Sequence, residues 1–429
     1  MTLPPNLEID QFIQNESAYR YQYDPAVTKL LTFYQLEGRY KIREWARLTV
    51  TGRIAYDPIY DIQPLSVTSP FGDRFDPTAP RPTFVKHFYP RVREAYVDLF
   101  FSKLDLRIGE QIARWGVIEG FRITDELNPL DFSEFLLREV TDRYIPVAMV
   151  KADFYQGDTT WEGVWIPQLI FNRPAPPGSE WVEFQLPPNL KNPPERFINS
   201  NAGIRVTRQI AGWDLGGSYL YAWDSFPSAS ESIFGLSGIS SHQASRFTPS
   251  YHRIHTLGVS FSKGIEGNVL KMEAAYVIGK FFGTNAFLPN TTNTSDVFEL
   301  RRNYLKYAFG WDTKVFGVDT FIQFSQQRIF DWDPTILQGR VQNGLSFLFQ
   351  KNLLYDRLIL KMLILYMPDS REAMIRPRME YRFTDRLKGA MGVDLFEGTL
   401  GSLSGPGTFH FIGYFNLNNR VYSELRYSF

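Results

Sequence analysis

The chain has 429 residues, with 46 basic and 46 acidic side chains and no cysteine. The balanced charge gives no reason to expect a nucleic-acid partner, and the lack of cysteine excludes disulfides, thiolate zinc sites and iron–sulfur clusters within this chain. No run approaches the roughly 18 consecutive apolar residues of a membrane helix. The nearest candidate, 358–367, is interrupted by Lys361 and alternates as a strand would.

A hairpin is the first clear element, because apolar and polar residues alternate from 35 to 56. One face carries Leu36, Tyr40, Leu48, Val50, Ile54 and Tyr56, and the other carries Gln35, Glu37, Arg39, Arg47, Thr49, Thr51 and Arg53. This period of two indicates β-strands. A soluble β-sandwich would explain this one hairpin as well as a membrane barrel would.

The same alternation repeats along the whole chain, in runs of about ten residues. Strands are predicted near 13–23, 30–41, 46–56, 91–101, 104–114, 146–156, 159–170, 201–209, 213–223, 251–262, 268–279, 300–312, 315–326, 340–350, 356–367, 373–383, 386–397 and 420–429. A tilted strand needs about this length to cross a bilayer, whereas soluble strands average nearer five or six residues. The repeat therefore favours a barrel over a sandwich.

The last strand has Val421, Leu425, Tyr427 and Phe429 on one face and Tyr422, Glu424, Arg426 and Ser428 on the other. A terminal strand of this kind, ending on an aromatic residue, is typical of bacterial outer-membrane β-barrels. Lipid would contact the apolar face, and the polar face would line the interior.

Connection lengths alternate between short and long, as expected of short periplasmic turns and long external loops. Both termini are then periplasmic, and eighteen strands result if 398–419 is one external loop, despite the strand-like pattern at 408–415. Sixteen strands is the alternative count. We expect an all-β, antiparallel, up-and-down transmembrane barrel that forms a single domain over 1–429. Its location would be the bacterial outer membrane, with the signal peptide removed and Met1 added as a start residue.

Residues 107–135 carry three short motifs in a fixed order. They are Arg107-Ile108-Gly109-Glu110-Gln111, Arg114-Trp115-Gly116 and Asn128-Pro129-Leu130-Asp131. Together with Trp165-Ile166-Pro167, the segment 176–180 and the terminal Tyr-Ser-Phe, this spacing resembles an uncharacterised family of proteobacterial, porin-like outer-membrane β-barrels. The resemblance implies a barrel and an outer-membrane location. It names no transported substrate, although a link to export of lipids or other hydrophobic compounds is suggested for the family.

The segment 115–145 is the strongest candidate for a functional loop. Asp131 is expected to be the N-cap of a short helix over 132–140, with Glu134 at the capping-box position and Phe132, Phe135 and Leu136 on its anchoring side. The loop is acidic, and its candidate constriction residues are Asp125, Glu126, Asp131, Glu134, Arg138 and Glu139. We expect it to fold into the lumen and narrow it. The alternative is an external lid packed on the rim.

Basic residues recur on the inward face of consecutive predicted strands. The candidate pore-lining residues are Arg376, Arg378, Arg382, Glu380, Arg357, Lys361, Lys388, Arg426, Arg39, Arg47 and Arg53, with Arg20 beside them and with Glu94 and Asp98 expected opposite. Opposed basic and acidic walls would set up a transverse field that selects solutes. The alternative is that these charges pair with one another and plug the lumen.

Apolar residues also fall on inward faces, which gives weaker support for a hydrophobic path. They are Phe100, Val164, Ile166, Ile359, Leu363 and Leu365. Strand ends lying outside the bilayer, or contacts with a plug, would explain them equally well.

Catalytic, metal and cofactor sites are not expected. No feature brings a Ser–His pair together. The closest histidines, His252 and His255, would face opposite sides of a strand, and the others are His87, His242 and His410.

The sequence therefore favours a porin-like channel for passive diffusion of small polar or amphipathic solutes, surrounded by outer-membrane lipids. One alternative is an export component that takes hydrophobic cargo from a periplasmic partner protein. The other is a barrel sheath around a separate cytochrome. The oligomeric state stays open.

Overall fold

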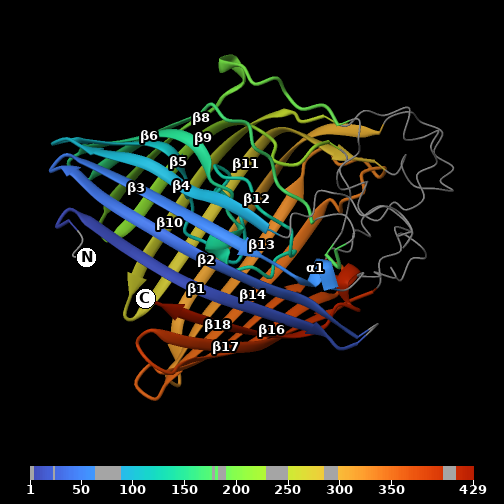
Figure 1. Cartoon of the computed structure of the whole chain (residues 1–429). Coiled ribbons are helices and arrows are strands. Elements are labelled where there is room, and N and C mark those ends of the chain that lie inside the picture. The colour runs from blue at the N-terminus through green and yellow to red at the C-terminus, as the bar shows by residue number, and fades with distance from the viewer. Residues whose placement is uncertain are drawn as a thin grey trace.

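The computed structural model describes residues 4–22, 25–62, 88–175, 179–181, 190–228, 250–284, 298–399 and 412–429. Within these ranges eighteen strands form one closed sheet (Figure 1). The strands are β1 (Leu7–Arg20), β2 (Ala26–Arg43), β3 (Ala46–Tyr56), β4 (Phe88–Phe100), β5 (Leu104–Gln111), β6 (Val147–Gln156), β7 (Thr159–Ile166), β8 (Asn201–Ile210), β9 (Trp213–Trp223), β10 (Arg253–Ile265), β11 (Asn268–Gly283), β12 (Glu299–Val315), β13 (Val318–Ile329), β14 (Val341–Leu353), β15 (Leu358–Met367), β16 (Glu372–Arg382), β17 (Leu387–Glu397) and β18 (Arg420–Ser428). Short helices are α1 (Ile59–Ile62), α2 (Val140–Arg143) and the 3₁₀ turns η1 (Phe197–Asn199) and η3 (Gly413–Phe415).

Every strand pairs antiparallel with its neighbours in the chain, and β1 closes the barrel by pairing with both β2 and β18. The predicted count of eighteen and the up-and-down topology are confirmed. The predicted first strand, 13–23, is wrong at both ends. β1 starts at Leu7 because Leu7 and Glu8 pair with Tyr40 and Arg39 near the end of the long strand β2.

The two ends of the barrel differ in their connections. The end that holds both chain termini, called the short-turn end below, has tight turns, and the other, long-loop end carries the extended connections (Figure 1). At the short-turn end the residue pairs Ala211–Gly212, Glu266–Gly267 and Phe316–Gly317 all have positive φ. A type I′ hairpin turn requires this at both central residues, and it matches the strand twist.

The predicted final loop is one connection, with η3 inside it. Residues 413–415 of the strand-like pattern form a turn of 3₁₀ helix with Ile412 as its N-cap, and 408–411 lie outside the described residues.

The two faces of the strands match the predicted alternation. Outward residues such as Leu257, Leu360 and Leu425 are large, apolar and exposed. Inward residues are mostly polar or charged, and Glu273 on β11 is 0% exposed. Among the described residues, no helix is long and apolar enough to cross a membrane.

If lipid contacts the outer face, a charge placed there should destabilise the barrel far more than a charge placed inside. We expect Val259→Arg, on the outer face of β10, to lower the free energy of unfolding by about 2–4 kcal/mol in lipid vesicles. Ser262→Arg, on the inner face of the same strand, should cost about 0.5 kcal/mol or less. Urea titration of vesicle-folded protein measures both values, and equal costs would contradict a lipid-facing exterior.

Candidate functional site: the loop in the barrel lumen

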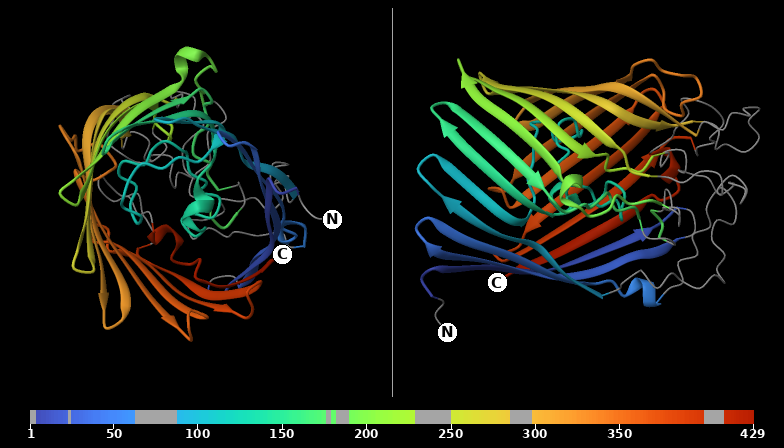
Figure 2. Two further views of the ribbon diagram at one scale, coloured as in Figure 1. Left: turned by 90° about the vertical axis from the view of Figure 1, so that its left-hand side faces the viewer. Right: turned by 90° about the horizontal axis from the view of Figure 1, so that it is seen from above.

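The connection between β5 and β6, residues 112–146, lies inside the ring of strands (Figure 2). We call it the lumen loop. Its only helix is α2, so the helix expected over 132–140 is wrong. The Asp131 carboxylate accepts the Ser133 N–H at 3.0 Å in a local turn, and Phe135 has a φ of 53°, which a right-handed helix does not allow. Phe135 is nevertheless an anchor, because it is fully buried against Phe396 and Phe415.

Glu273 of β11 binds the first part of the lumen loop. Its Oε1 accepts the backbone N–H of Ile118 at 2.7 Å and also that of Val117. Its Oε2 accepts the Thr124 hydroxyl at 2.9 Å and the Thr124 N–H at 3.2 Å. One buried carboxylate thus satisfies four donors of a segment that has no regular hydrogen bonding of its own.

The motif residue Asn128 joins the two ends of the lumen loop. Its side-chain oxygen accepts the Ala113 N–H at 2.9 Å, and its amide donates to the carbonyls of Gln111 (3.1 Å) and Ile145 (2.9 Å). Gln111 in turn donates to the Met149 carbonyl at 2.9 Å. The predicted motif therefore closes the loop onto strands β5 and β6.

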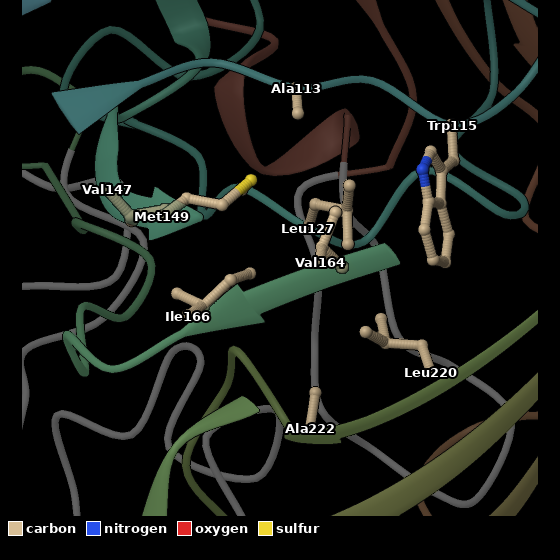
Figure 3. Packing of buried hydrophobic residues seen from close by; sticks show 9 residues of the cluster. All are labelled: Ala113, Trp115, Leu127, Val147, Met149, Val164, Ile166, Leu220 and Ala222. Carbon is tan, nitrogen blue, oxygen red and sulfur yellow. The ribbon is translucent and has the colours of Figure 1, made fainter. Parts of the chain in front are cut away.

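Trp115 anchors the loop to the wall formed by β6, β7 and β9. It is 1% exposed and packs with Leu127 of the loop against β6, β7 and β9 (Figure 3). A Cβ at Gly203 of β8 would lie 2.8 Å from the Trp115 ring, so glycine makes room for it. Val164 and Ile166, expected to line a hydrophobic path, belong to this cluster instead.

Glu134 holds the middle of the loop to the barrel seam. It is bonded to Lys29 of β2 at 2.7 Å and to Arg138 at 3.1 Å, and Lys29 is also bonded to Glu16 of β1. Although burial favours the neutral acid, Lys29 and Arg138 hold the pKa of Glu134 well below its ordinary value. Neither Lys29 nor Glu16 stood out in the sequence.

Three other loop carboxylates also have cationic partners. Glu126 binds Lys306, Asp142 binds Arg53 (3.0 Å) and Arg93 (2.9 Å), and Asp131 binds Arg173 (3.0 Å) and Arg138 (3.4 Å). Burial raises the pKa of each acid, but these cations outweigh it and hold each pKa below its ordinary value. Nearby cations therefore neutralise the charge of these three carboxylates in the loop that was predicted to be acidic.

Asp125 forms hydrogen bonds to other residues of the lumen loop. It accepts the Trp115 N–H at 3.1 Å and the Tyr144 hydroxyl at 2.5 Å. Burial and this carboxylate raise the pKa of Tyr144 to about 12. Glu139 is mostly exposed and lies 3.7 Å from Arg378.

The inward arginines of β16 are also paired. Arg376 donates to Asp394 of β17 at 2.7 Å and to the Leu137 carbonyl of the loop at 2.9 Å. Arg378 makes two bonds to Glu424 of β18, at 2.6 and 2.8 Å, and one to Glu380 at 2.9 Å. Lys361 is 3.1 Å from Glu380.

Other predicted wall residues occupy different positions. Arg357 lies in the turn before β15, so it is an exposed rim residue and not part of the wall, and Arg382 is exposed where β16 ends. Arg39 binds Glu8, Asp10 and Glu37 near the N-terminus.

Glu94 and Asp98 do not face the basic residues from across the barrel. They lie on β4, next to Arg47 and Arg53 of β3, and Asp98 binds Arg47 (3.1 Å) and Arg107 of β5 (2.7 Å). Glu94 accepts the Ile112 N–H at 3.1 Å. The expected arrangement of opposed walls is therefore wrong for these two residues.

Two of the cavities that border the lumen loop have room for a small solute. The larger, about 730 Å³, reaches toward the short-turn end, where Lys388 and Arg426 line it. Its lining has eight basic and five acidic side chains. The smaller, about 260 Å³, lies between the loop and the inner face of β13–β16.

In the described ranges, no cluster of three or more histidine, aspartate or glutamate side chains has the geometry of a metal site. His87, His242 and His410 lie outside those ranges, and Tyr219 contacts His255.

The closed eighteen-stranded antiparallel barrel matches solved structures of outer-membrane porins. The solved structure of Pseudomonas aeruginosa OpdK with vanillate has a TM-score of 0.53 and 9% identity, over 99% of this chain and 98% of that one. Pseudomonas aeruginosa OccK5 (OpdH) has a TM-score of 0.52 and 8% identity, over 99% and 97%. A BenF-like porin from Pseudomonas fluorescens Pf-5 has 0.52 and 8%, over 99% and 98%. At these identities the likeness establishes the fold alone.

The family model described as "Protein of unknown function (DUF1302)" matches residues 14–314, and the chain belongs to this family. No curated protein shows significant similarity to this chain.

Glu273→Gln should release the first part of the lumen loop while the barrel stays closed. A glutamine keeps the size but offers one acceptor oxygen, so the N–H groups of Val117, Ile118 and Thr124 cannot all be satisfied. A buried N–H group without an acceptor costs about 1–3 kcal/mol. We expect faster hydrogen exchange at 117–124 and faster tryptic cleavage after Arg122. Glu266→Gln, in an exposed turn, is the control and should change neither rate.

Acid should loosen the lumen loop. Asp131, Glu134 and Asp142 have lowered pKa values in the folded protein, so their stabilisation is complete above the ordinary 3.8–4.5 and is lost as pH falls through the lowered values. The chain has no cysteine, so a single spin label at Glu119→Cys reports loop motion. Mobility should stay constant from pH 8 to 5 and rise below about pH 4. In Glu134→Gln it should already be higher at pH 7, and a mobility rise between pH 8 and 6 would contradict the assignment.

Proposed function

We propose that this protein is a porin-like outer-membrane channel for passive diffusion of small polar or amphipathic solutes. Its short-turn end would face the periplasm, and its apolar outer face would contact outer-membrane lipids. The lumen loop would form the constriction, through Asp125, Glu126, Asp131, Glu134, Arg138 and Glu139.

One observation carries the proposal: a cavity of about 730 Å³ lies inside a closed barrel of eighteen strands and has a charged lining. A barrel of this size is too wide for its wall side chains to fill, so either a conduit or an inserted loop is expected. Here the loop occupies part of the lumen and leaves space beside it.

The solute preference would come from side chains that border this space. Arg53, Lys361, Arg378, Lys388 and Arg426 line the larger cavity, and so do Glu94, Glu139, Asp142, Glu380 and Glu424. Because most of these charges are paired, we propose a mild preference for anions set by the basic excess, and no strong transverse field.

Arg378→Glu tests the channel and its selectivity together. The reversal places a third carboxylate beside Glu380 and Glu424, so the permeability ratio of anions to cations should fall several-fold. Reversal potentials in planar bilayers with a salt gradient measure this ratio.

The matched control is Arg378→Glu with Glu424→Arg, which restores the pair and should return the ratio toward the original. A protein that inserts but never conducts would overturn the channel proposal. If that silent barrel carried lipid or a haem protein through purification, the export or sheath hypothesis would replace it.

A further inference from the structure

The smaller cavity differs in character from the rest of the lumen. Its volume is about 260 Å³, and its lining includes three apolar residues of the inner wall, Phe321, Leu348 and Leu363. Leu136 and Val140 of the lumen loop also line it. The other lining residues are mostly polar or charged, so the cavity offers both apolar and polar contacts.

Arg143, at the end of α2, lines the same cavity and has no anionic partner. Its Nε is buried and donates no hydrogen bond, and no described carboxylate lies within 4.0 Å of its guanidinium. Burial, together with the positive charge of Arg376, lowers the pKa of Arg143 to about 10, so it is still a cation at neutral pH. The residue as a whole is partly exposed, and a partly buried cation of this kind is normally satisfied by an anion or water.

The other cations around the cavity are already paired. Arg376 binds Asp394, Arg378 binds Glu424, and Lys271 binds Asp312 at 2.5 Å. Two carboxylates, Glu119 and Glu139, also line the space and would repel a second negative charge. The site therefore suits one negative charge next to an apolar body.

We propose that this cavity is a binding site for a small amphipathic monoanion, such as an aromatic or short-chain carboxylate. The carboxylate would pair with the fork of Arg143, which can bind both oxygens, and the apolar part would lie on Leu348 and Leu363. A cavity of this size is near the lower limit of small-molecule sites, so a single ring or short chain fits and a phospholipid does not. The inference rests on the proposed channel only for its physiological meaning, since binding is measured separately from conduction.

The test uses benzoate and octanoate as probes of the full-length protein in detergent, measured by calorimetric titration. Both should bind, while benzyl alcohol and malonate should bind at least ten-fold more weakly. Arg143→Gln should weaken benzoate binding at least ten-fold. Arg143→Lys keeps the charge without the fork, so its affinity for benzoate should lie between those of Arg143→Gln and the unchanged protein.

Arg386→Gln is the control, because Arg386 lies in the exposed turn between β16 and β17 and lines neither cavity. This variant should bind benzoate as the unchanged protein does. Leu363→Gln should weaken octanoate binding and leave the β-sheet circular dichroism signal unchanged.

The outcomes separate the two proposals. If benzoate binding is the same in Arg143→Gln and the unchanged protein, or if malonate binds as well as benzoate, the site is not where we place it, and conduction is unaffected by that result. If benzoate binds through Arg143 but no ion current appears in bilayers, the channel proposal fails and the binding site stands.

Discussion

The structure depends on how a long irregular segment satisfies its peptide groups inside a barrel. Strands bond to one another, but the lumen loop has only one helical turn, so several of its backbone donors need acceptors from side chains. Glu273 supplies them for Val117, Ile118 and Thr124, Asn128 supplies one for Ala113, and Gln323 supplies one for Gly120 at 2.8 Å. Each acceptor belongs to one position on the wall or loop, and together they fix where the loop lies and which cavities remain beside it.

The same device recurs at the final external connection. Glu372 of β16 accepts the N–H of Gly413 at 3.0 Å and of Ile412 at 3.3 Å, and Asn419 accepts the Phe396 N–H at 2.6 Å. Phe135 of the lumen loop packs on Phe415 of that connection, so the two irregular segments support each other. Inward carboxylates therefore serve as structural acceptors as well as lumen charges.

Much of the barrel could be predicted from the sequence because a strand's two faces meet different surroundings. That constraint is local, and it predicted the short turns, the even number of strands and most strand positions, but not the bounds of β1. The position of the lumen loop, by contrast, depends on contacts between residues far apart in the sequence. Glu273 looks like any inward acid of an alternating strand, and only the folded chain shows that it meets Val117 and Ile118, more than 150 residues away. The helix expected after Asp131 failed for the same reason, since burial of Phe135 among distant aromatics outweighed local helix preference.

The distribution of charge also depended on tertiary pairing. An acidic loop and a basic strand suggest opposed fields, yet several of the loop acids have specific cations: Glu126 has Lys306, Glu134 has Lys29, and Asp142 has Arg53 and Arg93. This pairing explains how Arg143 is left without a carboxylate in a loop rich in them. The neighbouring loop carboxylates pair with cations of the barrel wall, and these ion pairs hold the loop in place. A guanidinium next to apolar wall residues therefore remains available to a solute, and the contacts that fix the loop also create the site.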